Sequence, residues 1–187
     1  MVKPALKSAT YADVLAAPVG LIAEIINSEL YTSPRPSVLH NVAASRLNGS
    51  LMGPFDRGKG GPGGWHILFE QELHIVGQVM VPDLSGWRKV RLPEIPDVVG
   101  ITVAPDWACE ITSPSTRGLD RVIKMPRYAE AGVEWIWIVE PRDRSIEIYQ
   151  LDRGRYVIAD GFEGDAVVHP KPFDAVPFDL SELWSRT

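Results

Sequence analysis

Three side chains in the middle of the sequence have the types and the surroundings that metal or acid–base chemistry needs. Asp83 ends the apolar run 79–82, Glu110 lies inside the apolar run 107–111, and Lys124 follows in a predicted helix. Carboxylate oxygens are the ligands that Mg²⁺ prefers. A lysine can assist at such a site or neutralise a buried carboxylate. The three residues therefore predict either a divalent-cation site or a buried ion pair.

Glu110 is the least expected of them, because it lies on the strand face that a helix would cover. Period-two alternation puts Trp107, Cys109 and Ile111 on one face of the strand and Glu110 on the other. Removing an unpaired charge from water destabilises the fold or shifts the pKa of the group. Glu110 therefore needs a cation, a metal ion or a proton beside it.

The stretch 104–141 has the element order that positions Glu110 and Lys124. It consists of a strand, a Ser/Thr/Gly turn, a basic helical segment and a second strand, which is the pattern of a right-handed βαβ crossover. Asp120 and Lys124 are four residues apart and share one helix face, so Lys124 can reach over the sheet to Glu110. Pro126, inside the same helix, predicts a kink.

The rest of the chain predicts a mixed α/β fold, with a central mixed sheet flanked by helices and a hairpin near each end. The pattern indicates a short helix after Thr10, a hairpin over 21–31, a helix over 38–52, paired strands over 65–76 and 78–81, and a hairpin over 145–158. The Gly/Pro-rich segment 53–64 predicts a flexible loop.

Composition limits the class of protein. The 187 residues are predicted to form a single domain, 1–187. The single cysteine, Cys109, excludes an internal disulfide and a zinc ribbon. No apolar run is long enough to span a membrane and no signal peptide is evident, so we expect a cytoplasmic protein without membrane contact. The net charge of −5 argues against a protein that coats nucleic acid, but a local basic patch can still bind phosphate.

The order of several short motifs resembles a known group of nucleases. Asp83, Glu110 and a following lysine resemble the PD-(D/E)XK nuclease superfamily, in which two acids hold magnesium and a lysine assists the water that attacks a phosphodiester. More narrowly, the chain resembles the Uma-type family of restriction endonucleases. The matching pieces are 33–37, His40, 81–85, 109–116, Asp120, Lys124, Tyr128, 132–133 and 137–139, within matches that run from Glu24 to Tyr149. The resemblance implies a restriction-endonuclease-like core.

The resemblance also implies roles for individual residues. Asp83 and Glu110 would bind one Mg²⁺ or Mn²⁺, and Lys124 would orient the attacking water or neutralise the phosphate. The lysine of the superfamily usually lies two residues after the second acid, where this chain has Thr112. The helix must therefore supply the lysine here.

Three further residues are candidates with open alternatives. His40 would contact a substrate phosphate or a site acid, or is a polar surface or packing residue. Glu24 is a candidate third acid or an exposed strand acid. Arg121 belongs to a basic group that would bind substrate phosphate or form a solvated helix face, with equal weight. The group is Arg117, Arg121, Lys124 and Arg127.

The prediction is therefore a metal-dependent endonuclease that hydrolyses phosphodiester bonds of nucleic acid, DNA in the first instance, as a homodimer. The alternative is a nuclease-like domain without activity that acts as a binding or interaction module, with Lys124 and Glu110 as a structural ion pair. A metal-free hydrolase ranks third, because no GxSxG motif is present.

Overall fold

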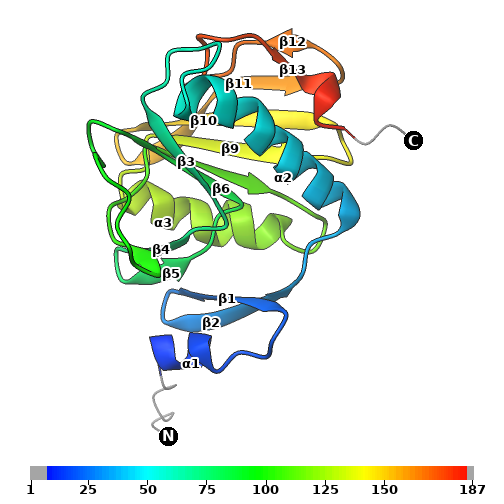
Figure 1. The fold of residues 1–187 in the computed structure, drawn as a ribbon. Coiled ribbons are helices and arrows are strands. Elements are labelled where there is room, and N and C mark those ends of the chain that lie inside the picture. The colour runs from blue at the N-terminus through cyan, green and yellow to red at the C-terminus, as the bar shows by residue number, and fades with distance from the viewer. Residues whose placement is uncertain (1–7, 185–187) are drawn as a thin grey trace, which may run out of the picture.

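A mixed sheet of six strands forms the centre of the protein, whose computed structural model describes residues 8–184 (Figure 1). The strand order is β11-β10-β9-β8-β6-β3, in which β8 and β9 run parallel and the other neighbours antiparallel. The strands are β3 (Trp65–Phe69), β6 (Leu84–Arg88), β8 (Trp107–Ile111), β9 (Trp135–Glu140), β10 (Ser145–Asp152) and β11 (Arg155–Glu163). The central mixed sheet and the C-terminal hairpin of β10 and β11 confirm the predictions.

A second sheet of five strands has the order β2-β1-β5-β4-β7. Its strands are β1 (Leu21–Ile26), β2 (Glu29–Pro34), β4 (Glu72–Ile75), β5 (Gln78–Met80) and β7 (Gly100–Ile101). The predicted N-terminal hairpin is β1 and β2. Its turn residues Asn27 and Ser28 have φ angles of 55° and 65°, as a two-residue type I′ turn requires. A short pair, β12 (Val167–Val168) and β13 (Phe178–Asp179), lies near the C-terminus.

Helical segments connect and cover the two sheets. They are α1 (Tyr11–Leu15), α2 (Val38–Leu51), η1 (Met52–Asp56), η2 (Leu119–Lys124), α3 (Met125–Glu130) and η3 (Leu180–Glu182). Ser37 begins α2 as its N-cap, because its side chain accepts a hydrogen bond from the His40 backbone N–H at 3.4 Å. No helix within the described part of the chain has the length and apolar character needed to cross a membrane.

The predicted βαβ crossover consists of β8, the helix formed by η2 and α3, and β9. The expected kink takes the form of a change in helix type: η2 is π-helical, and Pro126 lies in the first turn of α3. Because proline has no N–H, the carbonyl of Val122 loses its α-helical donor, and the wider π turn occurs where that bond is missing.

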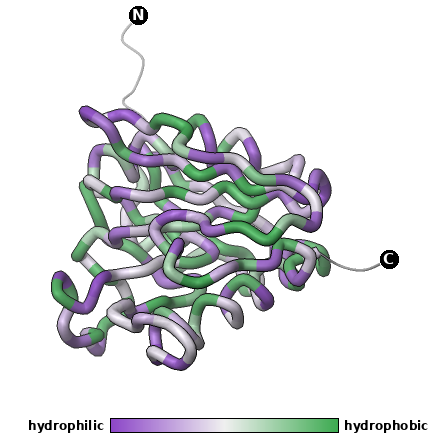
Figure 2. The backbone as a smooth tube through the Cα atoms, turned by 90° about the horizontal axis from the view of Figure 1, so that it is seen from above, coloured by the Kyte–Doolittle hydropathy of each residue, from purple (hydrophilic) through white to green (hydrophobic). Residues whose placement is uncertain are grey.

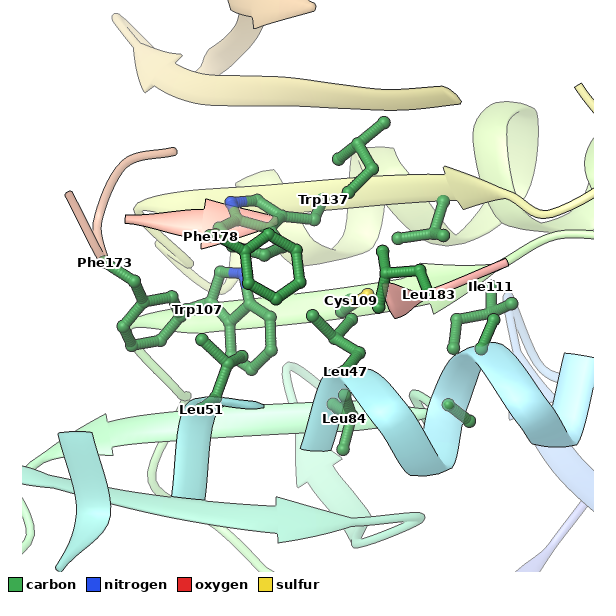
Figure 3. Close-up of a cluster of buried hydrophobic side chains, with 14 of the residues drawn as sticks. Leu47, Leu51, Leu84, Trp107, Cys109, Ile111, Trp137, Phe173, Phe178 and Leu183 are labelled. Atoms are coloured by element: carbon green, nitrogen blue, oxygen red, sulfur yellow. The ribbon is translucent and has the colours of Figure 1, made fainter. Parts of the chain in front are cut away.

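One face of the six-stranded sheet packs against α2 and the C-terminal segment. Leu47 and Leu51 of α2 contact the face of β8 that carries Trp107, Cys109 and Ile111 (Figure 3). Each of these five side chains is buried. The alternation predicted for β8 is therefore confirmed on this face.

The opposite face of the six-stranded sheet packs against α3 and the five-stranded sheet. Ala108 and Ile136 lie there with Tyr128 of α3 and with Leu73 and Met80 of the second sheet. Figure 2 shows apolar stretches along the stacked strands and hydrophilic colour at many of the turns. Glu110 points into this second layer, since it alternates with Cys109 along β8.

Two predicted elements are wrong in their extent. Residues 65–76 do not form one strand, because Glu70 has a φ angle of 46° between β3 and β4 and the two strands join different sheets. The segment 53–64 is not wholly a loop, because Met52–Asp56 continues the helical path of α2 as a π-helical turn. Phe55 is buried in the core there, which explains why the helix extends into glycine-rich sequence.

Candidate active site

A pocket lies between β1 of the smaller sheet and the end of β8 in the larger one. Its cavity volume is ≈ 450 Å³. The lining comes from β1, the connection between β2 and α2, the segment after β8, η2, and the turn after β9. Ends of parallel strands commonly bring distant segments together in this way. The ionisable side chains that line the pocket are Glu24, Arg35, His40, Asp83, Glu110, Asp120, Lys124 and Arg142.

Asp83 is fixed at the pocket by two donors from different elements. Its Oδ2 accepts a hydrogen bond from the backbone N–H of Ile111 at 2.7 Å, and its Oδ1 lies 3.0 Å from Nε2 of His40 in the first turn of α2. Burial alone would lower the pKa of His40, but the bond and charge of Asp83 outweigh it and the pKa is raised. His40 therefore contacts Asp83, which is one of the two candidate site acids, and does not lie free on the surface.

Glu110 and Lys124 form the predicted contact across the sheet. Nζ of Lys124 lies 2.8 Å from Oε1 of Glu110 and 2.9 Å from Oε1 of Glu24, and both carboxylates are buried. Tyr128 donates its hydroxyl hydrogen to the same oxygen of Glu110 at 2.5 Å. Glu24 also accepts a hydrogen bond from the backbone N–H of Val81 at 2.7 Å. The interpretation of Glu24 as an exposed strand acid is wrong, because the hairpin packs this face against η2.

Burial and neighbouring charges shift the pKa values of Glu110, Asp120 and Lys124. Burial raises the pKa of Glu110 well above its ordinary value, with Lys124 opposing and Asp120, Asp83 and Glu24 adding to the rise. Burial likewise raises the pKa of Asp120 to about 6. Burial alone would lower the pKa of Lys124, but Glu110 and Glu24 hold it well above its ordinary value. Lys124 is therefore a stable cation beside two acids, Glu110 and Asp120, whose pKa values are raised.

Comparison with known proteins identifies the family of the chain. A model of the Uma2 protein family, described as "Putative restriction endonuclease", matches residues 11–180. The chain belongs to the Uma2 family. A search of curated proteins finds no match.

The Uma2 chain also resembles a solved structure in fold. The crystal structure of a protein titled "a putative nuclease belonging to DUF820" from Anabaena variabilis ATCC 29413 superposes with a TM-score of 0.68. The two sequences are 20% identical, and the match covers 94% of this chain and 97% of the other. The restriction-endonuclease-like fold implied by the sequence motifs is therefore confirmed.

The carboxylates of Asp83 and Glu110 in the Uma2 pocket are ligands of the type that a hard divalent cation prefers. Among residues 8–184, no three or more His, Cys, Asp or Glu side chains are grouped to hold a metal ion. Oε2 of Glu110 makes no hydrogen bond or ion pair within that range, since both contacts of this carboxylate involve Oε1. Mg²⁺ is often bound through one or two protein carboxylates, with waters and substrate phosphates completing its shell. Asp83 and Glu110 fit that smaller ligand set.

Thr112 occupies the position at which the superfamily usually places its lysine. Its hydroxyl donates to Oε2 of Glu140 at 2.7 Å, so it lies in a separate polar cluster with Arg117, which contacts the same oxygen at 2.7 Å. Lys124 reaches Glu110 from the helix instead. That Lys124 takes the role of the strand lysine stays a prediction.

Arg121 does not line the pocket that contains the other candidate site residues. Its guanidinium donates to Glu147 at 2.5 Å and to the hydroxyl of Tyr149 at 3.0 Å, both on β10. Of the basic group considered in the sequence, Lys124 is the member that lines the pocket; Arg117 and Arg127 pair with acids elsewhere.

Two residues of the site had no role assigned from the sequence. Tyr128 orients Glu110, and Asp120 lines the pocket beside Lys124. Their signal is the spacing Asp120, Lys124, Tyr128, four residues at each step, which repeats on one helix face. Tyr128 is fully buried and Asp120 is 5% exposed, so this face points inward throughout.

Proposed function

We propose that the protein is a metal-dependent nuclease that hydrolyses phosphodiester bonds, with Asp83 and Glu110 as ligands of a Mg²⁺ or Mn²⁺ ion. The observation that carries the proposal is the convergence of Asp83, Glu110 and Lys124 in one pocket of a Uma2 chain. The three residues come from three separate segments, and the backbone N–H of Ile111 and the side chain of His40 hold the Asp83 carboxylate at the end of β8.

Each protein group has a distinct part in the proposed reaction. A bound divalent cation stabilises the charge that develops on the phosphate and lowers the pKa of water. Tyr128 holds Glu110 in place through its 2.5 Å hydrogen bond. Lys124, a cation at the floor of the pocket, neutralises the phosphate or orients the attacking water. His40 fixes Asp83, because its Nε2 lies 3.0 Å from Oδ1 of that carboxylate.

The second candidate function is a nuclease-like module without activity. It is favoured by the contacts of Lys124, whose side chain is 3% exposed and lies within 3 Å of two carboxylates. Buried pairs of this kind occur as structural elements in proteins without catalysis. In that case the only role of Glu24 and Glu110 would be to pair with Lys124 inside the folded protein.

A cleavage assay separates the two functions. Labelled single-stranded and duplex DNA and RNA are incubated with the wild-type protein in Mg²⁺, in Mn²⁺ or in EDTA. The matched variants are Asp83→Asn and Glu110→Gln, which keep side-chain shape, and the control is Glu163→Gln, an exposed glutamate on β11.

We expect cleavage by the wild type and Glu163→Gln that EDTA abolishes and that both site variants lose. Cleavage that persists at the wild-type rate in Asp83→Asn or Glu110→Gln would contradict the role of that residue. A folded wild type that cleaves none of the nucleic acids in either metal supports the inactive module.

A further inference from the structure

Two arginines at the mouth of the pocket form no ion pair with the residues that the structure describes. Arg35, in the connection between β2 and α2, and Arg142, in the turn after β9, both line the pocket and are exposed. Neither makes an ion pair or side-chain hydrogen bond within residues 8–184, although Arg35 lies near enough to Glu70 to act on its pKa. Elsewhere among residues 8–184, the arginines that pair with carboxylates are Arg88, Arg91, Arg117, Arg121, Arg127 and Arg144. The exposed Arg57, Arg153 and Arg155 form no ion pair within that range either, so Arg35 and Arg142 are set apart by their place at the pocket.

The unpaired arginines contrast with the floor of the same pocket. Glu24, Glu110 and Lys124 are 4%, 3% and 2% exposed, so a phosphate must enter the pocket to reach them. The rim also carries the hydroxyls of Ser113 and Ser115, which are common donors to phosphate oxygens. The rim of the pocket therefore carries positive charge and hydroxyl donors, and its floor carries buried carboxylates and a buried lysine.

The size of the pocket limits what can reach that floor. Its volume of ≈ 450 Å³ lies at the lower end of the range for pockets that hold one small molecule, about 300–1,000 Å³. A B-form double helix, whose major groove alone is about 12 Å wide, cannot enter a space of this volume. The phosphates of an intact duplex therefore stay at the mouth of the pocket. A single strand that leaves the duplex can enter the pocket and reach its floor.

We propose that the pocket takes a single nucleic-acid strand, with the phosphates on either side of the scissile one bound by Arg35 and Arg142. The inference rests on the proposed nuclease function and names its substrate class. Arg35 is attached to the five-stranded sheet and Arg142 to the six-stranded sheet, so a strand that contacts both crosses the pocket between the sheets. Arginine suits this task because its planar guanidinium binds phosphate through two parallel hydrogen bonds.

Fluorescence anisotropy tests the inference without relying on cleavage. A fluorescein-labelled oligothymidylate, and the same strand paired with oligodeoxyadenylate, are titrated with the full chain in Ca²⁺ over a series of salt concentrations. A gel after each titration checks that the strand is intact. The variants are Arg35→Ala, Arg142→Ala and the double variant, with Arg155→Ala as control. Arg155 is an exposed arginine of β11 outside the pocket.

We expect the single strand to bind more tightly than the duplex, and each pocket variant to weaken binding of the strand by about tenfold. The slope of log affinity against log salt should fall in magnitude by about 0.7 for each lost phosphate contact and by about 1.4 in the double variant. Arg35→Lys and Arg142→Lys should restore the slope but only part of the affinity, because lysine keeps the charge and loses the bidentate geometry. Arg155→Ala should match the wild type.

Three results would overturn the inference: no binding of the strand by the folded wild type, equal or tighter binding of the duplex, or an unchanged salt slope in the double variant. Failure of the nuclease function is distinguishable from these. A protein that binds the strand through Arg35 and Arg142 but never cleaves it contradicts the function alone. A protein that cleaves duplex with the double variant at full rate contradicts the substrate class alone.

Discussion

Asp120 should destabilise the folded protein at neutral pH, and its replacement by asparagine should therefore stabilise it. The carboxyl group is 5% exposed and its pKa rises from 3.8 to about 6, chiefly through burial and against the attraction of Lys124. A group whose pKa is raised on folding contributes stability that is fully present below pH 3.8 and is lost as pH rises through about 6. At about 1.36 kcal/mol per pKa unit, the loss amounts to about 3 kcal/mol.

Asparagine resembles the protonated acid, so Asp120→Asn removes this pH-dependent loss. Urea unfolding followed by tryptophan fluorescence, at a series of pH values, measures it. We expect the variant to exceed the wild type in free energy of unfolding by about 3 kcal/mol above pH ~7, and the difference to shrink toward zero near pH 4. Asp97→Asn, at an exposed carboxylate, is the control and should show no such trend. Equal stability of Asp120→Asn and wild type above pH ~7 would refute the reasoning.

Three further substitutions test the energetics of single contacts by urea unfolding. Lys124→Met leaves Glu24 and Glu110 buried without their cation and should cost about 3–5 kcal/mol; a loss below about 1 kcal/mol would contradict the ion-pair network. Tyr128→Phe removes the 2.5 Å hydrogen bond to Glu110 and should cost about 1.5–3 kcal/mol; a loss below about 0.5 kcal/mol would contradict this role of Tyr128. Ser28→Gly should stabilise the hairpin by about 1 kcal/mol, because Ser28 has a φ angle of 65°; destabilisation would argue against the I′ turn.

Local rules were sufficient to predict the centre of the site. Alternation along β8 identifies the face on which Glu110 lies, since a strand places successive side chains on opposite sides. The βαβ connection has one common handedness, so the helix that carries Lys124 had to cover that face. These two rules allow the contact between Lys124 and Glu110, which is 2.8 Å long in the structure.

What the sequence did not reveal depends on packing between distant segments. Glu24 was ambiguous because an acid on a hairpin is exposed or buried according to what the hairpin packs against, and β1 packs near η2. The chain turns at Glu70, so β3 and β4 join different sheets. No local sequence pattern predicts this turn. Arg121 instead bonds Glu147 and Tyr149 of β10, and the sequence of the helix alone does not show which strand it will face.

Titration calorimetry with Mn²⁺ tests most directly whether Asp83 and Glu110 form one metal site. The proteins are the wild type, Asp83→Asn, Glu110→Gln and the exposed control Glu163→Gln, each checked for folding by circular dichroism. The proposed site predicts saturable binding in the wild type and in the control, and loss of that binding in both site variants. Saturable binding that survives both Asp83→Asn and Glu110→Gln, or no binding by the folded wild type, would contradict it.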